Sequence, residues 1–242
     1  QGEESMQMNS PGGLGVRTLM RDQFAQGMRT LCNEIEADLA GLYLYGSRAI
    51  VPNETTIFKT NLADAANARK ILMDNGAPTS ELKMVIGTDA GAALRSQATI
   101  LSVIPSAQDM ATQGVLINAA GFQIRESAQI KSPAIGTTDG GTVGTAAYAI
   151  GATSIALAAK GNGTIVAGDV ISFANDPNYY VVVTGDTDVN GGGTIVIAEP
   201  GLRVAIAGGT APAITVYKKS NRSMAFARSA IVLATRMPAL PE

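Results

Sequence analysis

The sequence of 242 residues contains no histidine, no tryptophan and a single cysteine, Cys32. Histidine is the usual general base at neutral pH and the commonest metal ligand, so its absence removes most hydrolytic triads and metal centres. A lone cysteine can form neither an internal disulfide nor a thiolate zinc site. We therefore expect a protein that is not an enzyme, with no catalytic residues, no cofactor, no cofactor-binding residues and no metal ligands.

Strong charge and long apolar runs are also missing. The formal net charge is −2 and only 16% of the residues are charged, so no basic field is available for nucleic acid or an anionic membrane. No apolar run approaches the ~18–20 residues of a membrane span, and no secretion signal opens the chain. We expect no membrane partner. Because the first residue is Gln1, we expect the chain to be a piece of a longer protein.

The strongest pattern that is present runs over residues 16–45. Its apolar side chains recur in steps of four, four and three, which is typical of one face of a long helix. The stripe consists of Met20, Phe24, Met28, Leu31, Ile35, Leu39 and Leu42. A helix of this length is about twice the globular average or more, so it must cross its domain or reach beyond it.

The charges of this helix are ordered along it. Bases come first (Arg17, Arg21 and Arg29, with Asp22 as the lone acid among them) and acids come last (Glu34, Glu36 and Asp38). The helix dipole favours the opposite order. Either the charges form a solvated face without further meaning, or they face partners outside the chain.

Residues 16–130 are predicted to be mixed α/β. Asn61 can cap a helix over residues 62–74, which Gly76 and Pro78 would end. Thr88 can cap a second helix that continues toward Pro105. A short buried strand is predicted over residues 83–87, and an alternating strand over residues 121–130.

The composition changes after residue 131. From about 133 to 219 the chain is rich in Gly, Thr, Ala, Val and Ile, and it shows no helical period. Short β-type runs at 153–159, 169–174, 179–185, 193–199 and 213–219 alternate with strong turn signals. This pattern predicts an antiparallel barrel or sandwich. The tail, 220–242, could be a long strand that pairs back into the first region, which would make the β-domain an insertion.

Candidate chemical motifs are weak. Residues 186–191 (DTDVNG) match the first half of an EF-hand loop, but position twelve is Ile197 instead of a bidentate Glu, and the flanks are strands. A hairpin turn explains the same letters. Tyr179 and Tyr180 are predicted to be packing residues, and Met6, Met8, Met20 and Met28 to fill a core or an interface.

Several phrases resemble a known family. FAQGMRTLCNEIEADLAGLY, NLADAANARKILMDNGAP, VIGTDAGAALR and GFQIRESAQI, followed by TIVAGDVISFA, EPGLRVAI and SMAFARSAIVLATRMPALPE, are similar to major coat proteins of tailed bacteriophages. The sequence resembles most closely the coat proteins of Salmonella-type podoviruses. Those proteins have the Hong Kong ninety-seven capsid fold and an extra β-barrel.

The resemblance implies an α+β capsid-like fold with a long spine helix and an inserted antiparallel β-barrel. Residues 1–15 would be the end of an extended loop and 16–130 the peripheral and axial core. Residues 131–219 would be the inserted barrel, and 220–242 a strand that returns to the core. The family's N-terminal arm and closing strands have no counterpart, which leaves the assembly competence of this piece open.

The implied function is that of a structural subunit of a phage or prophage capsid. It would assemble with copies of itself into hexamers and pentamers, work with scaffolding and portal proteins, and enclose DNA without reading its sequence. Its location would be the virion, after assembly in the bacterial host cytoplasm. Two alternatives are the shell protein of a bacterial nanocompartment and a β-domain module for binding or adhesion.

Overall fold

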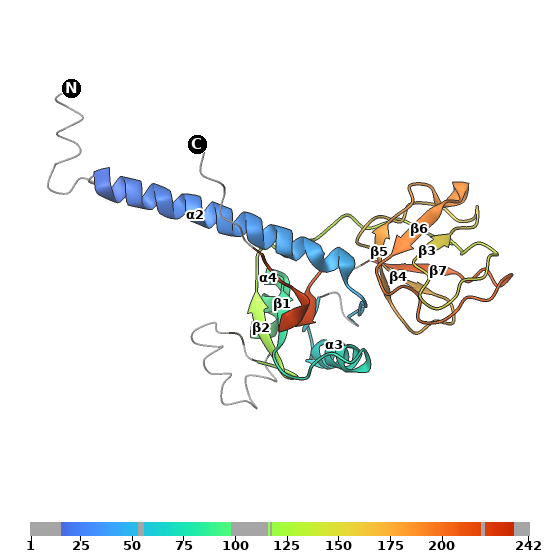
Figure 1. Ribbon diagram of the computed structural model, residues 1–242, viewed down its shortest axis with the longest axis horizontal. Coiled ribbons are helices and arrows are strands. Elements are labelled where there is room, and N and C mark those ends of the chain that lie inside the picture. The colour runs from blue at the N-terminus through green and yellow to red at the C-terminus, as the bar shows by residue number, and fades with distance from the viewer. Residues whose placement is uncertain (1–15, 53–55, 98–115, 117, 219–220, 235–242) are drawn as a thin grey trace, which may run out of the picture. The chain divides into compact units, whose positions relative to one another are not determined.

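The computed structural model describes residues 16–52, 56–97, 116, 118–218 and 221–234 (Figure 1). Contacts divide the chain into two compact units, one ending at Gly41 and the other beginning at Leu42. Each unit is described by itself. Together they form an α+β protein, as the sequence predicts.

The first unit contains helix α2, Val16–Gly41, whose 26 residues span about 39 Å. The predicted long helix is therefore confirmed, but it ends four residues earlier than expected. From Leu42 to Tyr45 the backbone tightens into a 3-10 turn, η1. The first turn of α2 carries no acidic residue and its last turn no basic one, so the dipole is not complemented at either end.

The second unit contains a three-stranded sheet in the order β2-β1-β8. The central strand β1, Leu82–Ile86, pairs in parallel with β2, Phe122–Glu126, and antiparallel with β8, Met224–Ala227. Both predicted strands of residues 16–130 are thus present. The chain leaves this sheet after β2 and returns to it in β8, so everything between them is an insertion in topological terms.

Two helices pack on this sheet: α3, Ala63–Asp74, and α4, Thr88–Arg95. Small residues let them lie close to the strands, and the buried cluster is made of Phe58, Ala65, Ala68, Leu82, Met84, Ile86, Ala90, Leu94, Ala119, Phe122, Ile124 and Ala227. The N-cap of α3 is Leu62 and not the predicted Asn61, and no side chain caps this helix. Asn61 Oδ1 does accept a hydrogen bond from the N–H of the first helical residue, Ala63 (2.9 Å). The predicted cap at Thr88 is wrong. Gly87 occupies that position in extended conformation, and no side chain caps α4.

The β-rich region forms a five-stranded antiparallel sheet in the order β3-β6-β5-β4-β7. Each strand falls inside one of the five predicted runs: β3, Ser154–Ala156; β4, Val170–Phe173; β5, Tyr180–Thr184; β6, Thr194–Ile197; β7, Ile214–Tyr217. A short 3-10 turn, η2, Val189–Gly191, precedes β6. The turn residues therefore separate the strands as expected.

The sequence predicted a barrel or a sandwich, and the resemblance implied a barrel. The strand pairings of the described residues do not close one. Strands β3 and β7 form the two edges of the five-stranded sheet. Only single bridges approach closure, since Val143 bridges Leu157 beyond β3 and Thr142 bridges Ala213 before β7. The segment around these two residues thus touches both edges without forming a strand.

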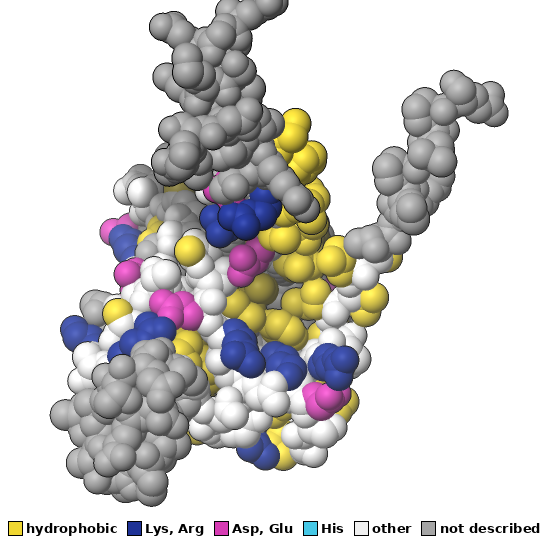
Figure 2. All heavy atoms as spheres, turned by 90° about the vertical axis from the view of Figure 1, so that its left-hand side faces the viewer, with side chains coloured by type: hydrophobic (Ala, Val, Ile, Leu, Met, Phe, Trp, Pro, Cys, Tyr) yellow, Lys and Arg dark blue, Asp and Glu magenta, His cyan; other side chains and the backbone are white. Residues whose placement is uncertain are grey.

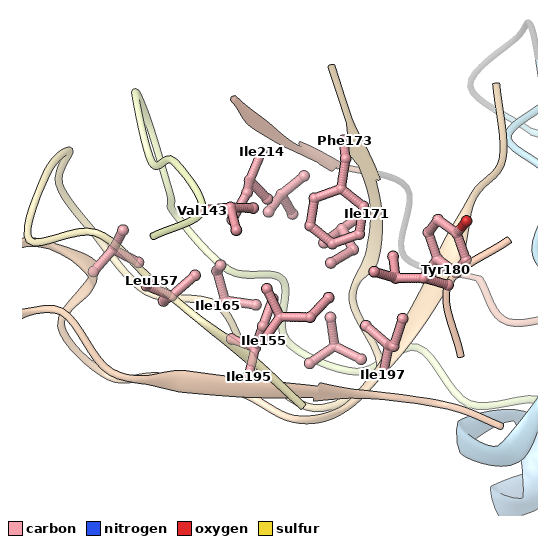
Figure 3. Close-up of a cluster of buried hydrophobic side chains, with 14 of the residues drawn as sticks. Val143, Ile155, Leu157, Ile165, Ile171, Phe173, Tyr180, Ile195, Ile197 and Ile214 are labelled. Carbon is pink, nitrogen blue, oxygen red and sulfur yellow. The ribbon is translucent and has the colours of Figure 1, made fainter. Parts of the chain in front are cut away.

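This sheet has its own hydrophobic core, in which aliphatic side chains from opposite sides point toward one another (Figure 3). The core consists of Val143, Ile155, Leu157, Ile165, Ile171, Phe173, Tyr180, Val182, Val189, Ile195, Ile197, Leu202, Ile206, Ile214 and Val216. It shares no residue with the cluster around the three-stranded sheet. Two separate cores therefore stabilise the second unit.

The two segments that lead into and out of the β-domain are tied together. The Arg222 backbone N–H donates to the Lys131 carbonyl (3.0 Å), and the Ser132 hydroxyl lies 2.5 Å from Asn221 Oδ1. Asn221 Nδ2 also donates to Asp89 on α4 (3.1 Å). The ends of the insertion consequently lie side by side at the three-stranded sheet.

Candidate functional site

A cavity of about 600 Å³ lies in the second unit. It lies between residues 42–52, α3, the edge strand β8 and the near ends of β4, β5 and β7. Its lining is mostly apolar, and its size falls within the range of small-molecule sites. The polar side chains that line this cavity include Tyr43, Arg48 and Arg222, which lie between the two cores of this unit.

Arg222 connects the two cores at this meeting point. Its side chain is only 7% exposed, and its Nε donates to the Gly168 carbonyl at the start of the β4 region (2.8 Å). Burial lowers the pKa of its guanidinium, while the charges of Asp169 and Tyr43 act in the opposite direction.

Gly168 has to be a glycine for two reasons. Its φ of +90° is in the region that other residues avoid, and a Cβ there would lie 2.7 Å from the Tyr43 hydroxyl oxygen. Tyr43 belongs to η1, and burial raises the pKa of its phenol. The close approach of Tyr43 and Arg222 to one turn thus depends on the absence of a side chain.

Asp169 organises the backbone around the same turn. Its carboxylate is fully buried and accepts hydrogen bonds from the Val166 N–H (2.8 Å) and the Gly136 N–H (3.1 Å). A Cβ on Gly136 would lie 2.4 Å from this carboxylate. Buried carboxylates need such partners, so Asp169 has a structural role in fixing the two loops.

A second polar group lies at Tyr180 on β5. Its hydroxyl donates to Asp176 Oδ2 (2.6 Å) and accepts from the Arg203 N–H (3.0 Å). Burial and the bond to Asp176 raise the pKa of Tyr180 to about 12. The Arg48 guanidinium lies 5.6 Å from the centre of its ring, within the range of a cation–π contact. Residues 42–52 therefore contact the β-domain through both Tyr43 and Arg48.

The chemistry available in the cavity is limited. Among the described residues that line it, Asp64 is the one carboxylate, and its Oδ2 accepts from the Phe58 N–H (3.3 Å). Ser47, Ser223 and Ser229 are also there, but no base adjoins them within the described lining. The cavity has room for an apolar group beside the guanidinium groups of Arg48 and Arg222. The polar contacts around it hold the two cores of the second unit together.

The weak motifs of the sequence lie elsewhere. In the 186–191 loop, Asp186 Oδ1 accepts from the Asp188 N–H (2.7 Å) and Asp188 Oδ1 accepts from the Asn190 N–H (3.1 Å). These contacts make successive turns of the kind that the hairpin interpretation expects. Within the part of the chain that the structure describes, no three Cys, Asp or Glu side chains gather into a possible metal site. Tyr180 is buried in the β-core, and Tyr179 packs edge-on against Tyr217.

The exposed apolar stripe of α2 is the second candidate surface. Met20, Phe24, Met28 and Leu31 are 60%, 74%, 59% and 53% exposed, and Cys32 is exposed beside them. Met6 and Met8, which were grouped with Met20 and Met28 in the sequence, lie outside the described residues. Hydrophobic side chains elsewhere also reach the surface between Lys, Arg and carboxylate groups, as Figure 2 shows for one face. No helix of the described chain combines the length and the apolar character needed to cross a membrane.

Sequence reasoning did not single out the junction residues Tyr43, Arg48, Gly168 and Arg222. For Arg222, a usable signal was its place just before a four-residue strand, at the boundary where the β-rich composition ends. Its partner Gly168 lies 54 residues away, a separation that no local pattern reports.

These features define an α+β protein with a long exposed helix and an antiparallel β-domain inserted into a small mixed sheet. No protein-family model matches the sequence, and no curated protein matches it. A solved structure from Mycobacterium phage Che8 is structurally similar, with a TM-score of 0.38 and 12% identity. The match covers 88% of this chain and 63% of that one, so the chain spans less than two thirds of its length. A likeness of this degree assigns no function.

Proposed function

We propose that the chain is a structural subunit of a bacteriophage or prophage capsid that assembles with copies of itself into hexamers and pentamers. The observation that carries the proposal is the order of elements. A long helix precedes a small mixed sheet, and an antiparallel β-domain is inserted between two strands of that sheet. This is the order that the family phrases of the sequence lead one to expect.

The surfaces fit such a role. Shell subunits meet through extended contacts between copies, in which apolar patches and opposite charges set the register. Helix α2 offers an exposed apolar stripe, and its first half is net positive while its second half is net negative. Scaffolding and portal proteins would be the further partners, and the enclosed DNA would be held without sequence-specific contacts. The protein would be a component of the virion and would not act as an enzyme.

The test is electron microscopy of the full-length product of the gene, expressed together with its scaffolding protein. Closed shells or curved sheets are expected. If the protein instead stays as small particles under every condition in which it is folded, the proposal is wrong.

A charge-reversal variant sharpens this test. Replacing Arg17 and Arg21 by Glu is expected to reduce the yield of shells while the melting temperature stays unchanged, because an exposed charge such as that of Arg21 contributes little to folding stability. The matched control is Lys160→Glu, an exposed residue of the β-domain. A fall in melting temperature with normal shells would mean that this face of the helix serves the subunit's own fold.

A nanocompartment shell is the alternative within the same kind of architecture. The inserted β-domain speaks against it. A neighbouring gene for a cargo enzyme, in place of portal and terminase genes, would favour it. Glycan or cell binding by residues 133–219 would favour the third reading, a binding or adhesion module.

A further inference from the structure

Helix α2 is an amphipathic rod, and nothing in the described part of its own unit covers its apolar side. From Leu19 to Glu34 every side chain is exposed, including Phe24 at 74%. A single helix of ordinary composition with a glycine inside it is only marginally stable in water. The stripe therefore calls for a partner, and the sequence of the helix indicates which one.

The stripe has a repeat of eleven residues, seen in the pairs Met20 and Leu31, Phe24 and Ile35, and Met28 and Leu39. Eleven residues make three turns plus only about 20° in a straight helix, so the stripe stays on one side along the rod. A partner helix can follow it over most of its length with little supercoiling. Extended contact between two such rods is thus geometrically simple.

The pattern is also symmetric about the middle of the helix, between Gly27 and Met28. Phe24 and Leu31 are equally far from this point, and so are Met20 and Ile35. Two copies of α2 placed antiparallel about a two-fold axis at this point would set each Phe24 against a Leu31. They would also set each Met20 against an Ile35. An isologous interface requires this self-complementarity.

The charges single out the antiparallel arrangement. Arg21 and Glu34 are also equally far from the midpoint, and the acids Glu36 and Asp38 follow Glu34. In a parallel pair the acidic halves would lie together and repel. Residues 16–27 carry Arg17, Arg21 and Asp22 (+2 − 1 = +1), and residues 28–41 carry Arg29, Glu34, Glu36 and Asp38 (+1 − 3 = −2). In an antiparallel pair the net positive half of one copy lies along the net negative half of the other. Arg21 and Glu34 fall on opposite flanks of the stripe, so the attraction acts between the halves as a whole more than through a direct ion pair.

Gly27 lies at the centre of this arrangement. A Cβ built on it has no neighbour within 4 Å, so its lack of a side chain does not serve packing within the described chain. In the two-fold pair both glycines would lie on the same flank of the crossing point. The absence of a Cβ there would allow the helices to approach closely.

We propose that α2 is a self-association element that pairs antiparallel with α2 of a second copy, with the two-fold axis between Gly27 and Met28. This inference rests on the helix itself and adds a specific contact between copies to the proposed structural role. Shells that form without the α2 pair would overturn this inference and leave the proposed function standing. An α2 pair in a protein that forms no shells would support this inference and overturn the proposed function.

Disulfide trapping of the full chain tests it in a Cys32→Ser background. Separate Phe24→Cys and Leu31→Cys proteins, when mixed and oxidised, should form the mixed disulfide dimer. Each alone should not, because two copies of residue 24 would be about 10 Å apart along the axis, beyond the reach of a disulfide. Homodimers of each single variant would indicate a parallel pair and overturn the proposal.

The matched control is the pair Gln26→Cys and Arg29→Cys. These positions are equally far from the same midpoint, but they lie on the opposite side of the helix, since two residues from Phe24 turn the helix by about 200°. They should not cross-link. Equal trapping of the control pair would mean random collision and would also overturn the proposal.

Sedimentation of the unmodified chain without scaffold gives an independent readout. A monomer–dimer equilibrium is expected, and Phe24→Glu should weaken it at least about tenfold because it would bury an unpaired carboxylate. Gln26→Glu, on the outer side, should leave it unchanged. A wild-type chain that is monomeric at every concentration would overturn the proposal.

Discussion

At the scale of single residues, the second unit depends on a few buried polar groups that join its two cores. Arg222 reaches from the start of β8 to the Gly168 carbonyl, and Asp169 holds the backbone of two loops nearby. Such groups are costly to bury and are tolerated only when they find partners. Their removal should therefore be felt more than that of exposed charges.

Arg222→Ala should lower the free energy of unfolding by about 1–3 kcal/mol, because the Gly168 carbonyl would lose its partner in a buried place. Arg222→Lys should restore little, since an ammonium does not reproduce the donor geometry of a guanidinium. Urea denaturation followed by circular dichroism measures both. The control is Arg228→Ala, whose ion pair with Glu81 is exposed, with an expected loss below about 1 kcal/mol. Equal effects at the two arginines would contradict the structural role of Arg222.

We expect the folded protein to lose stability at alkaline pH because of Tyr180. Its pKa is raised to about 12 in the fold, from 10.0 for a free phenol. The folded protein thus keeps this proton more tightly than the unfolded chain. The contribution of the neutral phenol is complete below pH 10 and disappears as the pH rises through about 12.

This loss can be followed by denaturation at a series of pH values, with tyrosinate absorbance as the titration signal. Tyr180→Phe should be about 1 kcal/mol less stable near neutrality, because the bonds to Asp176 and Arg203 are lost. It should also lose less stability between pH 10 and 12 than the parent. An unchanged alkaline profile in the variant would contradict the assignment.

At the scale of elements, local patterns predicted which segments are helices and strands better than where they end. The stripe of α2 was recognisable because its period extends over the whole helix, and the five β-runs because turn residues flank each one. Ends depend on neighbours. The tail was expected to be one long strand, yet β8 contains only Met224–Ala227, matched to the five residues of its partner β1. The chain then turns into a 3-10 segment, Arg228–Ala230.

Contacts between distant elements were the part that the sequence could not provide. The junction of Tyr43, Gly168 and Arg222 joins three segments whose local patterns carry no sign of one another. The missing barrel closure has the same cause, since the residues that bridge both edges, Thr142 and Val143, lie in a Gly- and Thr-rich segment without alternation.

The β-domain core should be as sensitive as that of an ordinary globular domain. Ile195 on β6 is fully buried, so Ile195→Ala should cost about 2–5 kcal/mol through lost contacts and the resulting cavity. Its neighbour Thr194 points outward, and Thr194→Ala should change stability by less than about 0.5 kcal/mol. Thermal unfolding of the two variants side by side makes the comparison. Similar effects at both positions would contradict the orientation of β6.

At the scale of the whole molecule, the second unit consists of two cores that share one junction. Each core has its own buried cluster, and the insertion leaves and re-enters the three-stranded sheet at adjoining residues. This arrangement favours independent folding of the inserted part.

Residues 133–219 expressed alone should therefore unfold cooperatively, with a sigmoidal transition in urea. The complementary chain, in which a short Gly-Ser loop joins Ser132 to Asn221, should fold as well, because these side chains lie 2.5 Å apart. Calorimetry of both pieces checks the prediction. A non-cooperative transition in the isolated β-domain would show that its core depends on the rest of the chain.

The return of the chain in β8 has a consequence for biosynthesis. Strands β1 and β2 leave the ribosome long before β8, and at about 5–20 residues per second the synthesis of residues 127–223 takes roughly 5–20 s. During that interval β1 has an open edge where β8 will pair. The β-domain can fold first, with its core complete, and bring Met224 to that edge. Folding of the inserted domain would then set the time at which β8 completes the three-stranded sheet. If the insertion folded slowly, the open edge of β1 would leave nascent chains exposed to aggregation or to chaperones.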